Sequence, residues 1–349
     1  MKNSLYKTAL LFLLMALTVP GFAKRGDVEK KKVIEKTFKV NDGTKLNIGN
    51  SFGKVHVNVW DQKSFSVTVE VIARKRNEDR AQQTLDKVDI DIEASSSEVS
   101  VMTNIKGQMN NNNNEGFEVN YVINMPSGNP LELKNSFGDV YIGDRNGKND
   151  LKISYCDLKI GKLTGKSEMK ISFSDGSIDE IGSGDLVLKY SDVNIGVLGV
   201  SKVHQEFSDI NIDKAETINL TSKYGEMNID EANGIKGSVS FSGFKLGKLG
   251  VEIDLKTSYS GNFRIEKIAK DFQLINLEGK FGEFKLAFAD GTNASFDIET
   301  KFCDFKYDDN IEMNYRVQGD FKGEYRGKMG NGDGGAIRIK SSYGDVKFY

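Results

Sequence analysis

The sequence predicts an all-β protein, a parallel β-helix of short coils, and two observations support this prediction. A phrase of an aromatic residue, a small residue and usually an acid recurs along most of the chain at steps of 17 to 22 residues, which indicates a stacked repeat array. Apolar residues alternate on both sides of each copy. The copies begin at Phe52, Phe137, Tyr155, Phe173, Tyr190, Phe207, Tyr224, Phe241, Tyr259, Phe281, Phe302 and Tyr343, with a weak one at Phe321.

One repeat contains two short strands. The residue four before the aromatic is apolar in nearly every copy, and the residues three and five after it alternate as in a half-buried strand. The aromatic position and the position three after it have opposite parity, so a bulge or corner must lie between them. We expect the alternating residues to point inward and stack, for example Leu186, Leu188, Val193, Ile195, Leu220, Met227 and Ile229.

The length of the repeat decides the type of array. Two strands and their turns fill 17 to 22 residues, which leaves no room for a helix in each repeat and excludes the helical solenoids. A parallel β-helix remains. Right-handed winding is the default for parallel crossovers, and a left-handed helix stays open as the minority option.

The first part of the chain departs from the repeat. Residues 1–23 resemble a secretory signal peptide, with an apolar run and a small-residue cleavage site, and no transmembrane helix is predicted there. A charged linker is expected over residues 24–33. Residues 34–130 are expected to form the first coils and a small capping element of strands with a short helix at about 77–88. The repeat array then spans residues 131–349.

Charge and cysteine content limit the partners. The net charge of −2 becomes −4 once a leader with two lysines and no acid is removed, and this near balance argues against nucleic acid. Cys156 and Cys303 both follow an aromatic, eight coils apart, which is too far for a disulfide. Both are expected to be small core or corner residues.

The pattern as a whole is similar to one family. A leader is followed by the coil Asn-Ser-Phe-Gly-Lys-Val at 50–55, a step at Trp60 into a strand, a short helix and serial Ser-Phe/Tyr-Gly-Asp-Val coils. Over roughly residues 34–349 the chain resembles the bacterial adhesin-like β-helix proteins, described mostly as adhesin candidates or domains of unknown function. The resemblance implies an exported β-helix with adhesion as its function, and it brings no catalytic residues.

The acids of the repeat would form a ladder with neighbours about 4.8 Å apart. Asp175, Asp192 and Asp209 are the members that could hold Ca²⁺, which takes several oxygen ligands. The favoured interpretation is structural, because short acids at turns accept hydrogen bonds from backbone N–H groups. We therefore predict no metal site.

The aromatic residues also have two interpretations. Stacked exposed rings form a platform for sugars and other flat partners. The parity of the aromatic position matches that of the inward apolar residue four positions earlier, which favours packing in the core or at a corner. Tyrosine at several copies suggests that some ring tips reach water.

Residues for catalysis are scarce. The chain has only His56 and His204, which gives a histidine triad or a multi-histidine metal site little material. Gly330, Gly332 and Gly335 spell Gly-x-Gly-x-x-Gly without the strand-to-helix context of a dinucleotide site. We expect no catalytic residues, no cofactor and no enzyme activity. An enzyme that cleaves polysaccharide with paired carboxylates is the alternative.

These observations predict an exported protein of the bacterial cell envelope, in the periplasm or at the cell surface. Its expected role is non-enzymatic binding, adhesion or scaffolding, with a glycan or protein of the envelope as ligand. A component of envelope sensing or maintenance is a further alternative.

The C-terminal residues suggest an association site. Val346, Phe348 and Tyr349 follow the last aromatic of the repeat and are expected to flank an open parallel edge. Such an edge pairs with another chain, which predicts end-to-end self-association or docking of a partner, unless the weak copy around Phe321 folds back over it.

Overall fold

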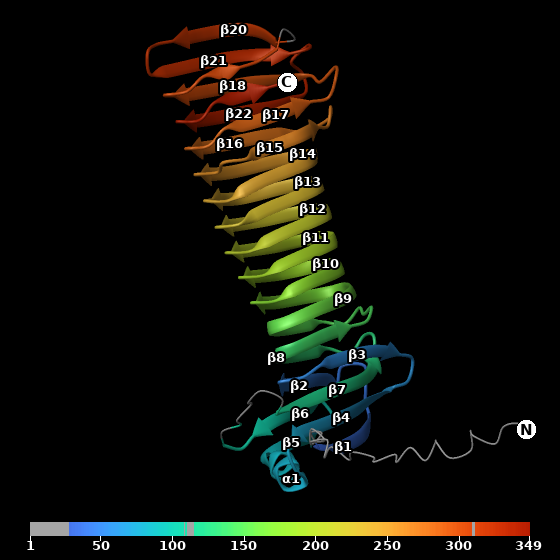
Figure 1. Ribbon diagram of the computed structural model, residues 1–349. Coiled ribbons are helices and arrows are strands. Elements are labelled where there is room, and N and C mark those ends of the chain that lie inside the picture. Colours follow the sequence, from blue (N-terminus) through green and yellow to red (C-terminus); the bar gives the residue numbers. More distant parts are fainter. Residues whose placement is uncertain (1–27, 108, 110–114, 309–310) are drawn as a thin grey trace, which may run out of the picture.

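The computed structural model describes residues 28–107, 109, 115–308 and 311–349, which form a tall stack of strands with one helix at its N-terminal end (Figure 1). The predicted signal peptide, residues 1–23, and residues 24–27 of the predicted linker lie outside the described residues. The rest of that linker is strand, because β1 begins at Val28. Within the described ranges, no helix is long and apolar enough to cross a membrane.

The elements follow one another in an almost unbroken series of strands. The N-terminal elements are β1 (Val28–Lys39), β2 (Lys45–Ser51), β3 (Val55–Trp60), β4 (Ser64–Lys75), α1 (Glu78–Lys87), β5 (Val88–Ala94), β6 (Glu98–Ile105) and β7 (Gly116–Pro126). The middle elements are β8 (Leu131–Ile142), β9 (Asn149–Ser172), β10 (Asp175–Lys189), β11 (Asp192–Glu206), β12 (Asp209–Lys223), β13 (Glu226–Ser240) and β14 (Gly243–Ser258). The C-terminal elements are β15 (Phe263–Ile268), β16 (Leu274–Lys280), β17 (Phe284–Phe288), β18 (Ala294–Lys301), β19 (Phe305–Lys306), β20 (Ile311–Gln318), β21 (Lys322–Met329), β22 (Gly335–Ser342) and β23 (Val346–Phe348).

The middle of the stack repeats one unit. Each strand from β10 to β13 starts at the acid after one aromatic and ends just before the next aromatic. Neighbouring strands pair in parallel, so that Ile178 lies beside Ile195, and Ile195 beside Ile212. Equivalent positions of successive repeats therefore stack on one another.

The interior is a continuous apolar column. All seven residues predicted to point inward, Ile195 among them, are at most 2% exposed. Because side chains alternate across a strand, the polar residues between them face solvent. The predicted inward face is confirmed.

The N-terminal element covers the first coil. Strands β2 and β3 pair directly with β8, and on their other side with β6 and β7, so the chain leaves the array after β3 and returns at β8. Antiparallel strands complete this end, with β5 on β6, β4 on β7 and β1 on β4. Helix α1 lies against β1 and β4, and Asn77 caps it by accepting a hydrogen bond from the Arg80 backbone N–H. The predicted short helix and strands are therefore present.

The C-terminal end contains a strand inserted out of chain order. β22 pairs in parallel with β16 on one side and with β18 on the other, although β18 to β21 precede it in the chain. β23 lies likewise between β17 and β19. The last coil of the sequence is thus not the last coil of the stack.

This insertion corrects the predicted partner edge. Val346 pairs with both Phe284 and Phe305 and is fully buried, and Phe348 is 4% exposed. Only Tyr349 is exposed, and its backbone bonds to Leu286 and Phe288. The expectation of an open edge at these residues is wrong, because the chain folds back before it ends.

The outer edge at this end is β20, which pairs antiparallel with β21, and β21 in turn pairs with β18. The β20–β21 pairing shifts register between Met313 and Tyr315, which marks a bulge. Arg316 lies over the ring of the buried Tyr325. A bulge and a charged side chain on the edge strand both discourage pairing with another chain, so the strands around Phe321 close this end.

Candidate functional site

A corner built on the repeat phrase positions the most distinctive surface of the molecule. Twelve aromatic residues have positive φ, between 50° and 63°, and they are the only non-glycine residues of the described chain that do. This left-handed conformation reverses the parity of the strand. At the corner of β10 and β11, Leu188 points inward and Tyr190 points outward, while Ser191 fills the interior corner. The aromatic side chain is therefore outside the core.

Serine hydroxyls hold successive corners together. The Ser174 backbone N–H donates to Ser191 Oγ at 3.1 Å, and the Ser191 N–H donates to Ser208 Oγ at 3.1 Å. Each hydroxyl donates in turn to a carbonyl two residues earlier in its own corner, as Ser191 Oγ does to the Lys189 oxygen at 2.9 Å. Cys156 takes the same place, and burial raises the pKa of its thiol. These bonds satisfy buried polar groups that a sharp corner would otherwise leave unpaired.

The twelve rings form one stack, which we call the aromatic ridge. Neighbouring centroids are 4.7 to 5.2 Å apart and neighbouring planes are within 13° of parallel. At each end the next ring is tilted, Phe117 on Phe52 by 54° and Phe321 on Phe302 by 44°. In spatial order the ridge is Phe52, Phe137, Tyr155, Phe173, Tyr190, Phe207, Tyr224, Phe241, Tyr259, Phe281, Tyr343 and Phe302.

The exposure of the ridge distinguishes the two interpretations of the aromatic residues. Eleven of the rings, from Phe137 onward, are 44 to 53% exposed, so they are not part of the core. The rings pack on one another at the corners of the coils, which is the second of the two packing positions considered above. Because each face is covered by a neighbour at about 4.8 Å, the ridge presents ring edges and tyrosine hydroxyls to solvent. Flat stacking of a ligand on a ring face is therefore blocked along its length.

The acids beside the ridge are structural in part. Asp175 Oδ1 accepts from the Asp192 backbone N–H at 3.0 Å, and Asp209 Oδ1 accepts from the Glu226 N–H at 2.8 Å. The carboxylates thus accept the backbone hydrogen bonds predicted for acids at turns, and the donor N–H belongs to the corner of the next coil. No group of three or more Asp, Glu, His or Cys side chains in the described ranges is placed to hold a metal ion.

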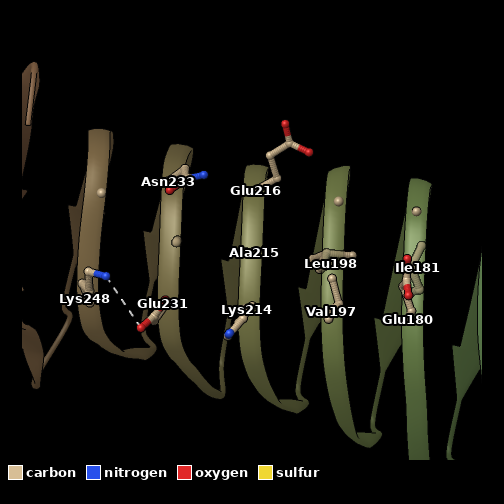
Figure 2. Close-up of a pocket in the computed structure, with 14 residues that line it drawn as sticks. Glu180, Ile181, Val197, Leu198, Lys214, Ala215, Glu216, Glu231, Asn233 and Lys248 are labelled. Atoms are coloured by element: carbon tan, nitrogen blue, oxygen red, sulfur yellow. Dashed lines mark ion pairs between the residues drawn. The ribbon is translucent and has the colours of Figure 1, made fainter.

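A second surface is a groove of about 400 Å³ across β10 to β14 (Figure 2). Its floor is low because Ala215 and Ala232 take the inward position that Ile181, Leu198 and Leu249 fill in neighbouring coils. One rim is the lowest row of labelled side chains in Figure 2. In order along the stack these are Glu180, Val197, Lys214, Glu231 and Lys248, with Lys248 Nζ 3.8 Å from Glu231 Oε1.

A third surface changes character along the stack. Asn194, Asn211 and Asn228 form a hydrogen-bonded ladder with steps of 2.9 and 3.0 Å. The same outward position then carries cations in five consecutive coils, each paired with an acid. In spatial order they are Lys245, Arg264, Lys285, Lys347 and Lys306, paired with Glu266, Glu283 or Asp345.

The cation Arg145 is buried within the otherwise apolar column. Arg145 is 2% exposed and occupies the inward position that Leu163, its neighbour in the next coil, fills with an apolar side chain. Its guanidinium donates to the Asn129 carbonyl and lies 3.0 Å from Met125 Sδ, while its Nε has no partner among the described residues. Burial lowers the pKa of Arg145 to about 10.

The two histidines are not brought together with acids into a catalytic arrangement. His56 belongs to β3, where its ring lies 4.2 Å from that of Tyr141, and His204 belongs to β11. The Gly-rich stretch at Gly330 and Gly332 forms the turn between β21 and β22. Sequence reasoning missed the left-handed corner, the groove and the buried Arg145. For the groove the signal was present, as two alanines at a position otherwise filled by Leu or Ile.

Comparisons with known proteins give likenesses to solved structures alone. No protein-family model and no curated protein matches the chain. Among solved structures, the chain is similar to a "putative cell adhesion protein" from Clostridium sporogenes at 12% identity, with 92% of this chain and 98% of that chain covered and a TM-score of 0.22. It is also similar to a "putative adhesin" from Bacteroides fragilis, at 12% identity, 92% and 98% coverage and a TM-score of 0.29. A third similar structure is a "putative adhesin" from Parabacteroides distasonis, at 11% identity, with 74% of this chain and 97% of that chain covered and a TM-score of 0.31.

Proposed function

We propose that this protein is an exported component of the bacterial cell envelope that binds a glycan or protein ligand through the aromatic ridge, without catalysing a reaction. Residues 1–23 serve as the signal peptide, and the mature chain works in the periplasm or at the cell surface. Residues 34–130 are the first coils and their cap. Residues 131–349 are a right-handed β-helix, in keeping with the usual hand of parallel crossovers.

One observation supports this proposal above the others, the retention of an exposed aromatic ring at every left-handed corner. For a residue other than glycine this conformation costs about 1–2 kcal/mol, and glycine or asparagine would adopt it more easily. Stacking returns about 0.5–1.5 kcal/mol per ring pair, so packing roughly offsets the strain and leaves little net gain in stability. The stripe of apolar ring edges, each about half exposed, is the kind of surface that marks a binding site.

The shape of the molecule suits binding to an extended partner. Eleven steps between the twelve stacked rings make the ridge roughly 50 Å long at the strand spacing, and ladder hydrogen bonds and a continuous core hold it rigid. A rigid surface loses little conformational entropy on binding. Long partners such as envelope polymers can therefore contact many coils at once.

The experiment is a binding screen of the mature chain against glycans and envelope fractions. The test variant carries Phe173→Asn, Tyr190→Asn and Phe207→Asn, because asparagine tolerates the left-handed conformation. The matched control carries Glu180→Asn, Val197→Asn and Lys214→Asn on the groove rim of the same region. Loss of binding in the ridge variant alone is expected. Equal binding by both variants, or release of cleaved polysaccharide by the wild type, would contradict the proposal.

A further inference from the structure

The aromatic ridge has a period of two coils. From Phe137 to Phe302 in spatial order, phenylalanine and tyrosine alternate without exception over eleven rings. In chain order the alternation breaks, because Phe281 is followed by Phe302. The inserted last coil places Tyr343 between these two and restores it. The alternation is therefore a property of the folded surface.

The fold does not require this alternation. Phenylalanine and tyrosine have the same ring, and the spacing stays between 4.7 and 5.1 Å along these eleven rings. The extra hydroxyls make no hydrogen bond with any described residue, and the five tyrosines are 45 to 52% exposed. The small corner residues (Gly, Ser or Cys) and the stacked core residues repeat at every coil and show no two-coil period. The two-coil period therefore points to a ligand that contacts the exposed hydroxyls.

The distance between successive tyrosine hydroxyls can be compared with the repeat lengths of extended polymers. Tyrosine hydroxyls on one line recur at roughly 9.6 Å, twice the step between rings. An extended peptide turns the same side outward about every 6.6 Å, which does not match. A polyproline helix repeats at about 9.3 Å but docks its prolines on exposed aromatic faces, and here neighbouring rings cover those faces.

A β-1,4-linked glycan does match. Each sugar of such a chain spans close to one coil spacing, and successive sugars are turned by half a rotation. A given hydroxyl therefore returns to the same side at every second sugar, as the tyrosines return at every second coil.

The carboxylates beside the ridge supply a second set of contacts. An acid follows the small residue in six consecutive coils, the acid row of Asp139, Asp157, Asp175, Asp192, Asp209 and Glu226. Asp175 and Asp209 each use one oxygen for the next backbone N–H, which leaves the other oxygen to accept from a ligand hydroxyl. The row gives way to Gly243 in the following coil. One carboxylate per coil corresponds to one per sugar, and negative charge disfavours an acidic polymer.

We infer that the ridge between Phe137 and Tyr224 binds an unbranched, uncharged β-1,4-linked glycan laid along the stack, with one sugar per coil and one disaccharide per Phe–Tyr pair. This inference rests on the proposed function and names its ligand class. The tyrosine hydroxyls and the outer oxygens of the acid row hydrogen-bond the sugar hydroxyls, except at Asp139, whose Oδ2 lies 2.7 Å from Lys54 Nζ.

The test is calorimetric titration of the mature chain with cellohexaose and chitohexaose, beside maltohexaose and laminarihexaose as α-1,4 and β-1,3 chains. Affinity for the β-1,4 chains is expected to increase from the disaccharides cellobiose and chitobiose to the hexasaccharides. It is also expected to exceed the affinity for maltohexaose and laminarihexaose. Tyr190→Phe with Tyr224→Phe should lower it about 10-fold, as the loss of two neutral hydrogen bonds predicts. Tyr141→Phe with Tyr315→Phe, outside the ridge, should not change it.

A phase variant isolates the period itself. Tyr190→Phe with Phe207→Tyr keeps the number of hydroxyls and the stack but places one hydroxyl out of phase, and should lower affinity about 3-fold or more. Wild-type affinity in this variant, or equal binding of all four hexasaccharides, overturns the inference. If no β-1,4 chain binds while a ridge-dependent envelope ligand appears in the screen above, the inference fails and the proposed function stands. If no ligand depends on the ridge, both fail.

Discussion

The ring of Tyr343 stacks on that of Phe281, with centroids 4.8 Å apart and planes 6° from parallel, although β17 to β22 lie between them in the chain. The charges on β22 and on the strands at its two sides are complementary. Lys340 on β22 lies beside Glu278 on one side and Glu299 on the other, with its Nζ 3.1 Å from Glu299 Oε1. Opposite charges on neighbouring strands stabilise their pairing, so the last coil has a specified place inside the stack.

Ile195→Asp tests the stacked core. Ile195 is 1% exposed and lies between Ile178 and Ile212, so the variant buries an unpaired charge and should lower the free energy of unfolding by about 3–5 kcal/mol. Urea unfolding measures this change in the free energy of unfolding. The control is Val197→Asp, two residues along the strand but 42% exposed, expected to change stability by less than about 0.5 kcal/mol. Equal effects of the two substitutions would contradict the register.

Substitution of Phe207 tests the strained corner. Phe207 has φ 50°, so Phe207→Gly should be more stable than Phe207→Ala by about 1 kcal/mol, the reverse of the order in an ordinary strand. Both should be less stable than the wild type, because each loses stacking on Tyr190 and Tyr224. Thermal unfolding of the three proteins compares them. An alanine variant as stable as the glycine variant would show that the corner is unstrained.

Calcium tests the acid row. Asp175 and Asp209 accept backbone hydrogen bonds, so we predict that adding Ca²⁺ or a chelator leaves the melting temperature unchanged. A ligand bound only by the folded state must raise it. The prediction is wrong if a saturable rise appears and is abolished by Asp192→Asn with Asp209→Asn.

Arg145 offers a stabilising substitution. Its guanidinium is buried without a carboxylate partner in the described part of the chain, and burial lowers its pKa to about 10, so it stays charged at neutral pH. Arg145→Leu installs the residue that the next coil uses, and should leave stability unchanged or raise it by about 1–4 kcal/mol, as seen when buried charges are replaced by apolar side chains. Arg145→Ala, which leaves a cavity, should be the less stable variant. A large loss in the leucine variant would show that the guanidinium holds the cap to the array.

The repeat could be predicted from the sequence because a parallel stack places equivalent residues on one another. The inward face from Leu186 to Ile229 and the short helix near residue 77 followed from the periodicity of apolar residues alone. The outward turn of Tyr190 did not, because a left-handed aromatic residue has no signature in side-chain pattern. The place of Val346 did not follow either, since insertion out of chain order depends on long-range pairing.

The inserted strand β23 yields the last prediction. Val346 is fully buried between Phe284 and Phe305, so Val346→Lys should cost about 3 kcal/mol or more and remove hydrogen-exchange protection from β16 to β19. Tyr349→Lys, at a residue 49% exposed, is the matched control and should change stability by less than about 0.5 kcal/mol. Light scattering should give the same mass for the wild type and Tyr349→Lys. If Val346→Lys instead kept wild-type protection and dissociated an end-to-end dimer, β23 would be the open edge that chain order suggests.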